Sequence, residues 1–188
     1  MRRVLKLLIV FATVALVWAP LNARADGYLS PWAGVQFGSS ASNGRAGFGV
    51  NAGGMGAGIV GGELDFGYSP SFFGTENDFG HNTVINLMGN IIVGVPVGGE
   101  HGAGVRPYAT VGLGLIRTQI DGGKLFQGAS GNNQLGWDAG AGVMGFFNDH
   151  VGLRGDLRYF RDVNGDIVNG IDLGQLHFWR LSAGVVIR

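Results

Sequence analysis

The sequence contains no cysteine among its 188 residues, and beyond residue 25 it contains no apolar run of about 18 residues. The first absence excludes disulfides and thiolate metal sites. The second excludes a transmembrane helix in that part of the chain, because such a helix needs about 20 predominantly apolar residues. A sustained helical period is also missing there, so amphipathic helices do not account for the fold.

The first 25 residues are typical of a secretory signal peptide. Two arginines and a lysine precede an uncharged apolar stretch (7–21), and Ala23-Arg24-Ala25 follows it. The stretch is short for a membrane-spanning helix, and the small-x-small ending suits a signal peptidase. We therefore predict a signal peptide over residues 1–25 and a mature domain over 26–188. A retained membrane anchor is the alternative.

The balance of charge does not favour a nucleic-acid partner. The chain has 13 basic and 13 acidic residues, and four of the basic ones but none of the acidic ones lie in the predicted signal peptide. The mature domain therefore has 9 basic residues against 13 acidic ones, a net charge of −4. A mildly acidic domain lacks the basic surface that binds phosphate backbones, so we expect no nucleic acid among its partners.

Glycine is unusually frequent, at 37 residues, all of them beyond residue 25. This density opposes helices. The glycines lack the period of collagen and alternate with Val, Leu, Ile and Phe, which argues against a disordered tract. The composition therefore indicates an all-β chain with curved, closely packed strands.

Apolar and polar residues alternate along most of the mature domain. In the last such segment Trp179, Leu181, Ala183, Val185 and Ile187 share one face, because successive strand residues point to opposite faces. The same period predicts eight strands, over residues 31–38, 45–53, 58–69, 83–97, 106–120, 134–147, 151–161 and 176–187.

The predicted connections alternate in length. Residues 70–82, 121–133 and 162–175 form long polar loops, whereas 54–57, 98–104 and 148–150 are short turns, and only the first outer loop, 39–44, is brief. Short periplasmic turns and longer extracellular loops are typical of a meander across the outer membrane. We therefore predict an eight-stranded antiparallel up-and-down transmembrane β-barrel. A soluble barrel or sandwich with its apolar residues inside is the alternative.

If the apolar residues face lipid, several aromatic residues lie at the membrane interfaces. Such interfaces favour amphipathic rings. The predicted girdle comprises Phe37, Tyr68, Trp137, Tyr159 and Trp179 near the extracellular ends and Phe147 near the periplasmic side. Arg117 and Arg161 also fall on the apolar face, but at strand ends, where they reach the headgroups.

Four segments resemble the outer membrane protein β-barrel family, the small OmpA-like and OmpX-like barrels, across residues 27–187. They are PWAGVQFG at 31–38, GGELDFGY at 61–68, RPYATVGLG at 106–114 and the final amphipathic strand. The resemblance implies a location in the outer membrane. It also implies outer-membrane lipid and lipopolysaccharide as surroundings, and insertion by the barrel assembly machinery.

The polar face of the predicted strands carries charges of both signs. These residues are Glu63, Asp65, Arg106, Asp138, Arg154, Asp156, Arg158 and Arg180, with Gln36, Asn51, Asn86 and Asn90 as further hydrogen-bonding groups. An eight-stranded barrel is only wide enough to be filled by side chains, so these charges must pair with one another. The preferred interpretation is a structural network that replaces a hydrophobic core. The alternative is a narrow gated pore for ions or small solutes.

The sequence offers little for catalysis, so we predict no enzymatic activity, no catalytic residues and no cofactor. A lipid-modifying barrel enzyme would need a nucleophile beside a base, but Ser182 and His177 are five residues apart on one strand and face opposite sides. The segment 162–166 resembles the start of a calcium loop, but Ile167 and Leu173 stand where that loop requires glycine and glutamate. We therefore predict no metal site.

The predicted outer loops are acidic. They contain Glu76, Asp78, Asp121, Asp162, Asp166 and Asp172 against a single lysine, Lys124. Exposed loops on a rigid scaffold often carry function, so a host or envelope partner is expected at these loops. Their alternative role is to cap the barrel. The function predicted from the sequence is therefore envelope integrity or surface interaction.

Overall fold

The computed structural model describes residues 25–38, 41, 44–73, 81–98, 102–123, 126–163, 166–168, 171–174 and 176–188. All of the predicted signal peptide except Ala25 lies outside these residues, so its removal stays a prediction. Within the described ranges, no helix is long and apolar enough to cross a membrane.

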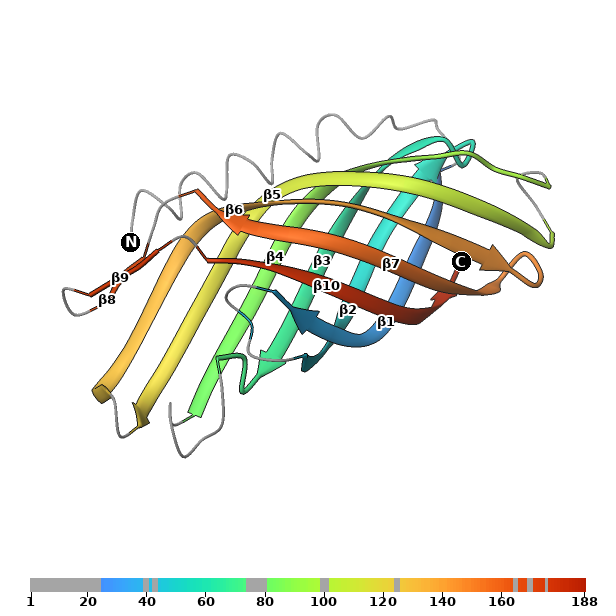
Figure 1. Ribbon diagram of the computed structural model, residues 1–188. Coiled ribbons are helices and arrows are strands. Elements are labelled where there is room, and N and C mark those ends of the chain that lie inside the picture. The colour runs from blue at the N-terminus through green and yellow to red at the C-terminus, as the bar shows by residue number, and fades with distance from the viewer. Residues whose placement is uncertain are drawn as a thin grey trace.

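Eight strands form one closed antiparallel barrel, which confirms the predicted fold class. Each strand pairs with its neighbours along the chain, and the first closes on the last (Figure 1). The barrel strands are β1 (Ala25–Phe37), β2 (Arg45–Gly56), β3 (Val60–Pro70), β4 (His81–Gly94), β5 (Gly104–Gly123), β6 (Phe126–Phe146), β7 (Val151–Asp162) and β10 (His177–Ile187). A separate hairpin, β8 (Asp166–Val168) and β9 (Ile171–Gly174), lies between β7 and β10 in the chain.

The structure differs from the predicted segments in three places. The first strand begins at Ala25 and not at 31, so its periplasmic half was missed. Most of the loop predicted at 121–133 belongs to β5 and β6, and the loop predicted at 162–175 contains the β8–β9 hairpin. The other barrel strand ends differ from the prediction by three residues or fewer.

Strands β4, β5 and β6 project beyond the rim at the extracellular end (Figure 1). The β5–β6 ladder continues to Gly123↔Phe126, whereas the β6–β7 ladder ends at Gly136↔Asp162. On its other side β5 pairs with β4 as far as His81↔Asp121. These three strands therefore form a small sheet outside the part of the barrel that eight strands close.

The two faces of the wall have opposite chemistry. Along β7, alternate side chains are exposed and buried, as the sequence period predicts. The outward face carries large exposed hydrophobic side chains such as Leu64 (59% exposed), Ile91 (61%) and Leu153 (54%). A soluble protein rarely exposes a continuous apolar surface of this extent, so the predicted outward orientation is confirmed and the soluble alternative is rejected.

Glycines on the inner face make room for large side chains. A Cβ at Gly112 would collide with the Asn90 amide, and one at Gly49 would lie 2.6 Å from Cζ2 of Trp32. A Cβ at Gly140 would lie 2.7 Å from Cγ of Arg158. The high glycine content therefore has a direct use in a crowded, narrow interior.

We expect Gly140→Ala to lower the free energy of unfolding by about 1–3 kcal/mol, because the new methyl group overpacks the lumen against Arg158. Urea unfolding of the refolded barrel in lipid vesicles measures this change. Gly145→Ala is the control, since a Cβ there would meet no atom within 4 Å. Equal stability of the two variants would contradict the argument from crowding.

Candidate functional site in the barrel interior

The structure places all eight predicted charged residues inside the barrel. Each has 4% or less of its surface exposed: Glu63, Asp65, Arg106, Asp138, Arg154, Asp156, Arg158 and Arg180. They come from strands that the barrel order sets across the lumen, and β3 stands directly opposite β7. Their close approach therefore depends on closure of the wall.

Arg158 of β7 is the centre of this arrangement, and four carboxylates surround its guanidinium group. Its Nη2 lies 2.6 Å from Glu63 Oε1 and 3.3 Å from Asp156 Oδ2. Its Nη1 lies 3.3 Å from Asp65 Oδ2 and 3.6 Å from Asp138 Oδ2. The side chains of Arg158, Glu63 and Asp65 are fully buried, so solvent screens these interactions little.

Two further arginines complete the arrangement. Arg154 Nη1 lies 2.5 Å from Glu63 Oε2, and its Nε lies 3.1 Å from Asp156 Oδ2. Arg180 donates two hydrogen bonds to Asp65, one of them at 3.0 Å to Oδ1, in the bidentate geometry that guanidinium favours. We call the seven residues Glu63, Asp65, Asp138, Arg154, Asp156, Arg158 and Arg180 the ion-pair cluster.

Aromatic rings lie against two arginines of the ion-pair cluster. The Arg180 guanidinium carbon is 4.1 Å from the ring centroid of Trp32 and 4.8 Å from that of Phe160. That of Arg154 is 4.8 Å from the Tyr108 ring. Such cation–π contacts stabilise a cation away from water. The rings contact the flat faces of the guanidinium groups, whereas the carboxylates bind their edges.

Neutral side chains donate further hydrogen bonds to the carboxylates of the ion-pair cluster. Tyr28 donates to Glu63 Oε2 at 2.6 Å, and Tyr108 donates to Asp156 Oδ2 at 2.9 Å. Ser182 donates to the other oxygen of Asp156, also at 2.9 Å. The prediction from the sequence missed both tyrosines. The signal was available for Tyr108, which shares a strand face with Arg106.

The four predicted hydrogen-bonding residues, Gln36, Asn51, Asn86 and Asn90, are also buried in the lumen. Asn86 donates to Asp65 Oδ1 at 2.7 Å. With its amide oriented to satisfy both ends, Asn90 donates to Asp138 Oδ1 at 2.7 Å and accepts from Arg158 Nη1 at 2.8 Å. The polar groups predicted to face inward therefore all do so.

Arg106 lies apart from the ion-pair cluster, near the periplasmic end. Its guanidinium carbon is 5.6 Å from the Phe146 ring centroid, and its Nη1 is 4.0 Å from the sulfur of Met55. Gly58, which has a φ of +65° in the β2–β3 turn, packs against the same guanidinium group. The structure therefore brings seven of the eight predicted charges together and leaves Arg106 at the periplasmic mouth.

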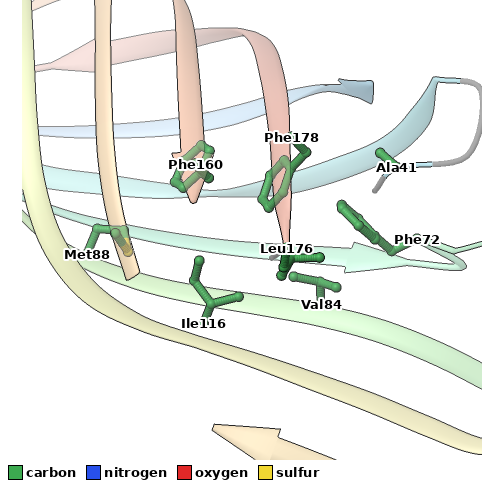
Figure 2. Close-up of a cluster of buried hydrophobic side chains, with 8 residues drawn as sticks. All are labelled: Ala41, Phe72, Val84, Met88, Ile116, Phe160, Leu176 and Phe178. Carbon is green, nitrogen blue, oxygen red and sulfur yellow. The ribbon is translucent and has the colours of Figure 1, made fainter. Parts of the chain in front are cut away.

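A hydrophobic cluster closes the extracellular end of the interior. Its eight side chains, which Figure 2 shows together, come from four strands and three of the connections between strands: Ala41, Phe72, Val84, Met88, Ile116, Phe160, Leu176 and Phe178. Phe160 and Phe178 stack at 5.0 Å, and Phe72 meets Phe178 edge-on at 4.9 Å. Phe72 is fully buried although it follows the end of β3, so the chain beyond that strand turns back into the lumen.

A second hydrophobic cluster fills the periplasmic end. It consists of Tyr28, Met55, Ile92, Tyr108, Met144, Phe146 and Val186. The interpretation of the charged network as a replacement for a hydrophobic core is therefore incomplete. The interior has three layers, with the ion-pair cluster between two hydrophobic ones.

On the outer wall, three of the six predicted girdle rings touch one another. The ring centroids of Trp137 and Tyr159 are 5.6 Å apart, and those of Tyr159 and Trp179 are 5.1 Å apart. Phe37 is paired with Trp179 across the β1–β10 ladder. Tyr68 packs instead on Phe48, which the prediction missed, at 5.3 Å. Phe147, the predicted periplasmic ring, is 65% exposed just beyond the end of β6.

The structure gives no arrangement typical of a catalytic or metal centre in its described part. Ser182 points inward to Asp156, whereas the His177 ring lies on the outer face, 6.3 Å from that of Tyr159. Among the described side chains, no group of three or more His, Asp or Glu residues is placed to hold a metal. Asn164 and Gly165 of the calcium-like segment lie outside the described residues.

A family model described as the outer membrane protein beta-barrel domain matches residues 9–186 of the chain. A comparison with curated protein sequences gave no significant match.

Three solved structures similar to this chain are bacterial β-barrels. Neisserial surface protein A shares 21% identity over 86% of this chain and 96% of its own, with a TM-score of 0.64. The N-terminal β-barrel domain of Pseudomonas aeruginosa OprF shares 16% identity over 87% and 98%, with a TM-score of 0.50. The Yersinia pestis attachment invasion locus protein Ail, in complex with the heparin analogue sucrose octasulfate, shares 15% over 87% and 99%, also at 0.50. At these identities the likeness shows the fold alone.

We expect Arg158→Met to lower the free energy of unfolding by about 3–5 kcal/mol, because it leaves several buried carboxylates without their shared cation. Urea unfolding in vesicles measures the loss. Arg117→Met, at an exposed position of β5, is the control and should change stability little. Adding Asp138→Asn to Arg158→Met should recover part of the loss. Equal effects of Arg158→Met and Arg117→Met would show that the ion-pair cluster does not support the fold.

Proposed function

Because the chain belongs to the outer membrane protein beta-barrel domain family, we propose that it is a non-enzymatic outer-membrane barrel that acts through its extracellular end. In this proposal the barrel anchors a surface-exposed interaction site and contributes to envelope integrity. The observation that supports it most is the filled interior. A lumen packed at three levels leaves the extracellular end and the outer wall as the surfaces open to other molecules.

The extracellular end offers an extended surface for contact. The projecting sheet of β4, β5 and β6 stands clear of the wall, and loops on rigid scaffolds often carry binding sites. The acidic residues of the outer segments favour a neutral or cationic partner. A sulfated polysaccharide, of the kind whose analogue is bound by Ail, suits them poorly because like charges repel.

A narrow gated pore is the second candidate. Arg158 lies within 3.6 Å of four carboxylates, so its guanidinium group has alternative partners that a rearrangement would exchange. Opening would also require both hydrophobic clusters to move, because each fills one end of the interior. This second requirement makes the pore the weaker candidate. A lipid-modifying enzyme is weaker still, since Ser182 and His177 face opposite sides of the wall.

Two partners follow from location alone. The outward apolar surface requires the hydrocarbon of outer-membrane lipids around it. In the outer leaflet this lipid is lipopolysaccharide. Insertion of a closed barrel implies the barrel assembly machinery.

We expect the refolded barrel to show no steady unitary conductance in planar lipid bilayers, because the hydrophobic clusters seal both ends. Arg158→Ala should be equally silent, since it opens space only in the middle layer. Heat-modifiable gel migration verifies that each sample is folded. Discrete current steps in the wild-type protein would support the pore instead.

Shortening the projecting hairpin should abolish surface binding and leave the barrel intact. Replacing residues 121–129 by Asn-Gly joins Ile120 to its ladder partner Ser130 through a tight type I′ turn. Adhesion to an epithelial monolayer is compared for cells producing intact or shortened protein at equal surface abundance. Replacing the β2–β3 turn, on the periplasmic side, is the control. Unchanged adhesion of the shortened protein would contradict a binding role for the hairpin.

A further inference from the structure

We propose that Asp138 is a proton-binding site of the barrel interior, which takes up a proton from the medium as the pH falls below neutral. The bound proton removes an excess negative charge from the ion-pair cluster. This inference depends on the charges and contacts inside the closed wall. It does not depend on the role proposed for the extracellular end.

The ion-pair cluster contains one acidic residue more than it contains basic ones. Three arginines face four carboxylates, so the cluster carries a net charge of −1 when every member is ionised. All seven residues are buried. An uncompensated charge at such a depth is costly, and a buried ionisable group takes its neutral form more readily. Arginine stays protonated in proteins, so a carboxylate must be the group that changes.

The two other basic residues on the inner face lie toward the ends of the barrel. Arg106 packs against Phe146 at the periplasmic end. Arg45 is the first residue of β2, at the extracellular rim. Within the described ranges, the ion pairs of the four carboxylates come from the three arginines of the cluster. The excess charge is therefore not offset by a further cation of the chain.

The contacts within the cluster identify the carboxylate that holds the proton. Glu63, Asp65 and Asp156 each lie within 3.3 Å of two arginines. Asp138 has one arginine neighbour, Arg158, whose Nη1 is 3.6 Å from Oδ2. That distance is too long for a hydrogen bond. Asp138 is therefore the carboxylate whose negative charge is least compensated.

The two oxygens of Asp138 have unequal surroundings. Oδ1 accepts a hydrogen bond from the Asn90 amide at 2.7 Å. Oδ2 is buried and receives no hydrogen bond from the described part of the chain. Ionisation would leave this oxygen charged and without a donor, whereas a proton makes Oδ2 itself a donor. We therefore assign the proton to Oδ2.

The charged groups that face Asp138 come from three other strands. They are Arg158 on β7, Arg180 on β10, and Asp65 and Glu63 on β3. The other neighbours are uncharged. Gly112 of β5 and Phe160 of β7 are its ladder partners, Asn90 comes from β4, and the adjacent inward positions of β6 are glycines. Asp138 therefore has no second cation within hydrogen-bonding distance among the described residues.

Proton uptake also changes how Arg158 is shared. Its Nη1 lies 3.3 Å from Asp65 Oδ2 and 3.6 Å from Asp138 Oδ2. A neutral Asp138 leaves this nitrogen to Asp65, whereas an ionised one competes for it. Protonation therefore strengthens the link between β7 and β3 across the lumen.

The site gives the stability of the barrel a specific pH dependence. The pKa of an aspartate in an unfolded chain is about 3.9, so the unfolded barrel releases this proton above about pH 4. A folded barrel that retains the proton is favoured by acid, and its stability should rise as the pH falls from 8 to 5. Carboxylates that are ion-paired in the folded state give the opposite trend, and mainly below about pH 5.

Urea unfolding of the refolded barrel in lipid vesicles at pH 8 and pH 5 tests this dependence. Between these pH values the unfolding equilibrium constant of the wild type should fall about tenfold more than that of Asp138→Asn, since one proton is bound over about one pH unit. Asparagine has the shape of the protonated acid, so Asp138→Asn should be at least as stable as the wild type at pH 8. Asp149→Asn, at an exposed position of the β6–β7 turn, is the control and should keep the wild-type dependence.

A second substitution separates Asp138 from the cluster as a whole. Asp156→Asn removes the same charge, but its carboxylate accepts hydrogen bonds from Tyr108, Ser182 and Arg154. At pH 8 its unfolding constant should exceed that of Asp138→Asn by at least about tenfold, because these donors lose a charged acceptor. Equal stability of the two variants would remove the assignment to Asp138.

Infrared spectroscopy of the wild-type barrel observes the proton directly, so this measurement does not depend on refolding of a variant. With aspartate isotopically labelled at its side-chain carboxyl group, a carboxylic-acid C=O band should appear as the pH is lowered from 8 to 5. Asp138→Asn should lack this band, and Asp149→Asn should retain it.

Two kinds of result would overturn the proposal. Absence of the acid band at pH 5, or an equal pH dependence of the wild type and Asp138→Asn, would show that Asp138 stays charged. A small metal cation could also offset the excess charge. Greater stability at pH 8 in sodium chloride than in choline chloride, lost in Asp138→Asn, would assign the site to such a cation and not to a proton. Neither result bears on adhesion through the hairpin.

Discussion

The structure depends on closure of the hydrogen-bonded wall. Hydrocarbon contains no water to satisfy an open strand edge, so β1 must find β10 and complete the ring. Closure at eight strands leaves a lumen only wide enough for side chains. The inward side chains of all eight strands must therefore fit together in one narrow lumen. Glycines such as Gly112 and Gly140 provide the space for the larger side chains.

The ion-pair cluster joins strands that never touch along the wall. Glu63 on β3 and Arg158 on β7 are 95 residues apart in the chain and stand on opposite sides of the ring. Removing charges from water is costly, and a buried ion pair need not be more stable than a well-packed apolar replacement. The ion-pair cluster instead favours one strand register over others, because a buried carboxylate that does not meet its cation is left without a partner. A register shift of one residue in β3 would turn Glu63 and Asp65 out toward lipid.

The alternating period was sufficient to predict which residues line the lumen, because it follows directly from strand geometry. The same period could have placed Trp32 with Gln36, Phe160 with Arg158 and Phe178 with Arg180, all inward, but apolar character was assigned to the outer face throughout. The long projection of β5 and β6 could not be predicted in this way. Above the membrane a hairpin is wetted on both sides, so it pairs without any alternation in its sequence. Contacts across the lumen also need the closed ring, which no local pattern contains.

A filled lumen changes where function can be expected on such a barrel. If the outer rings served only to anchor the wall, an even distribution around the circumference would serve best, since every strand crosses the same interface. The rings follow that distribution here: Trp137, Tyr159, Trp179, Phe37, Phe48 and Tyr68 lie on β6, β7, β10, β1, β2 and β3, six of the eight strands. They therefore serve to anchor the wall at the membrane interface. With the lumen filled and the rings at this interface, the projecting sheet of β4, β5 and β6 is the part of the described structure best placed to contact another molecule.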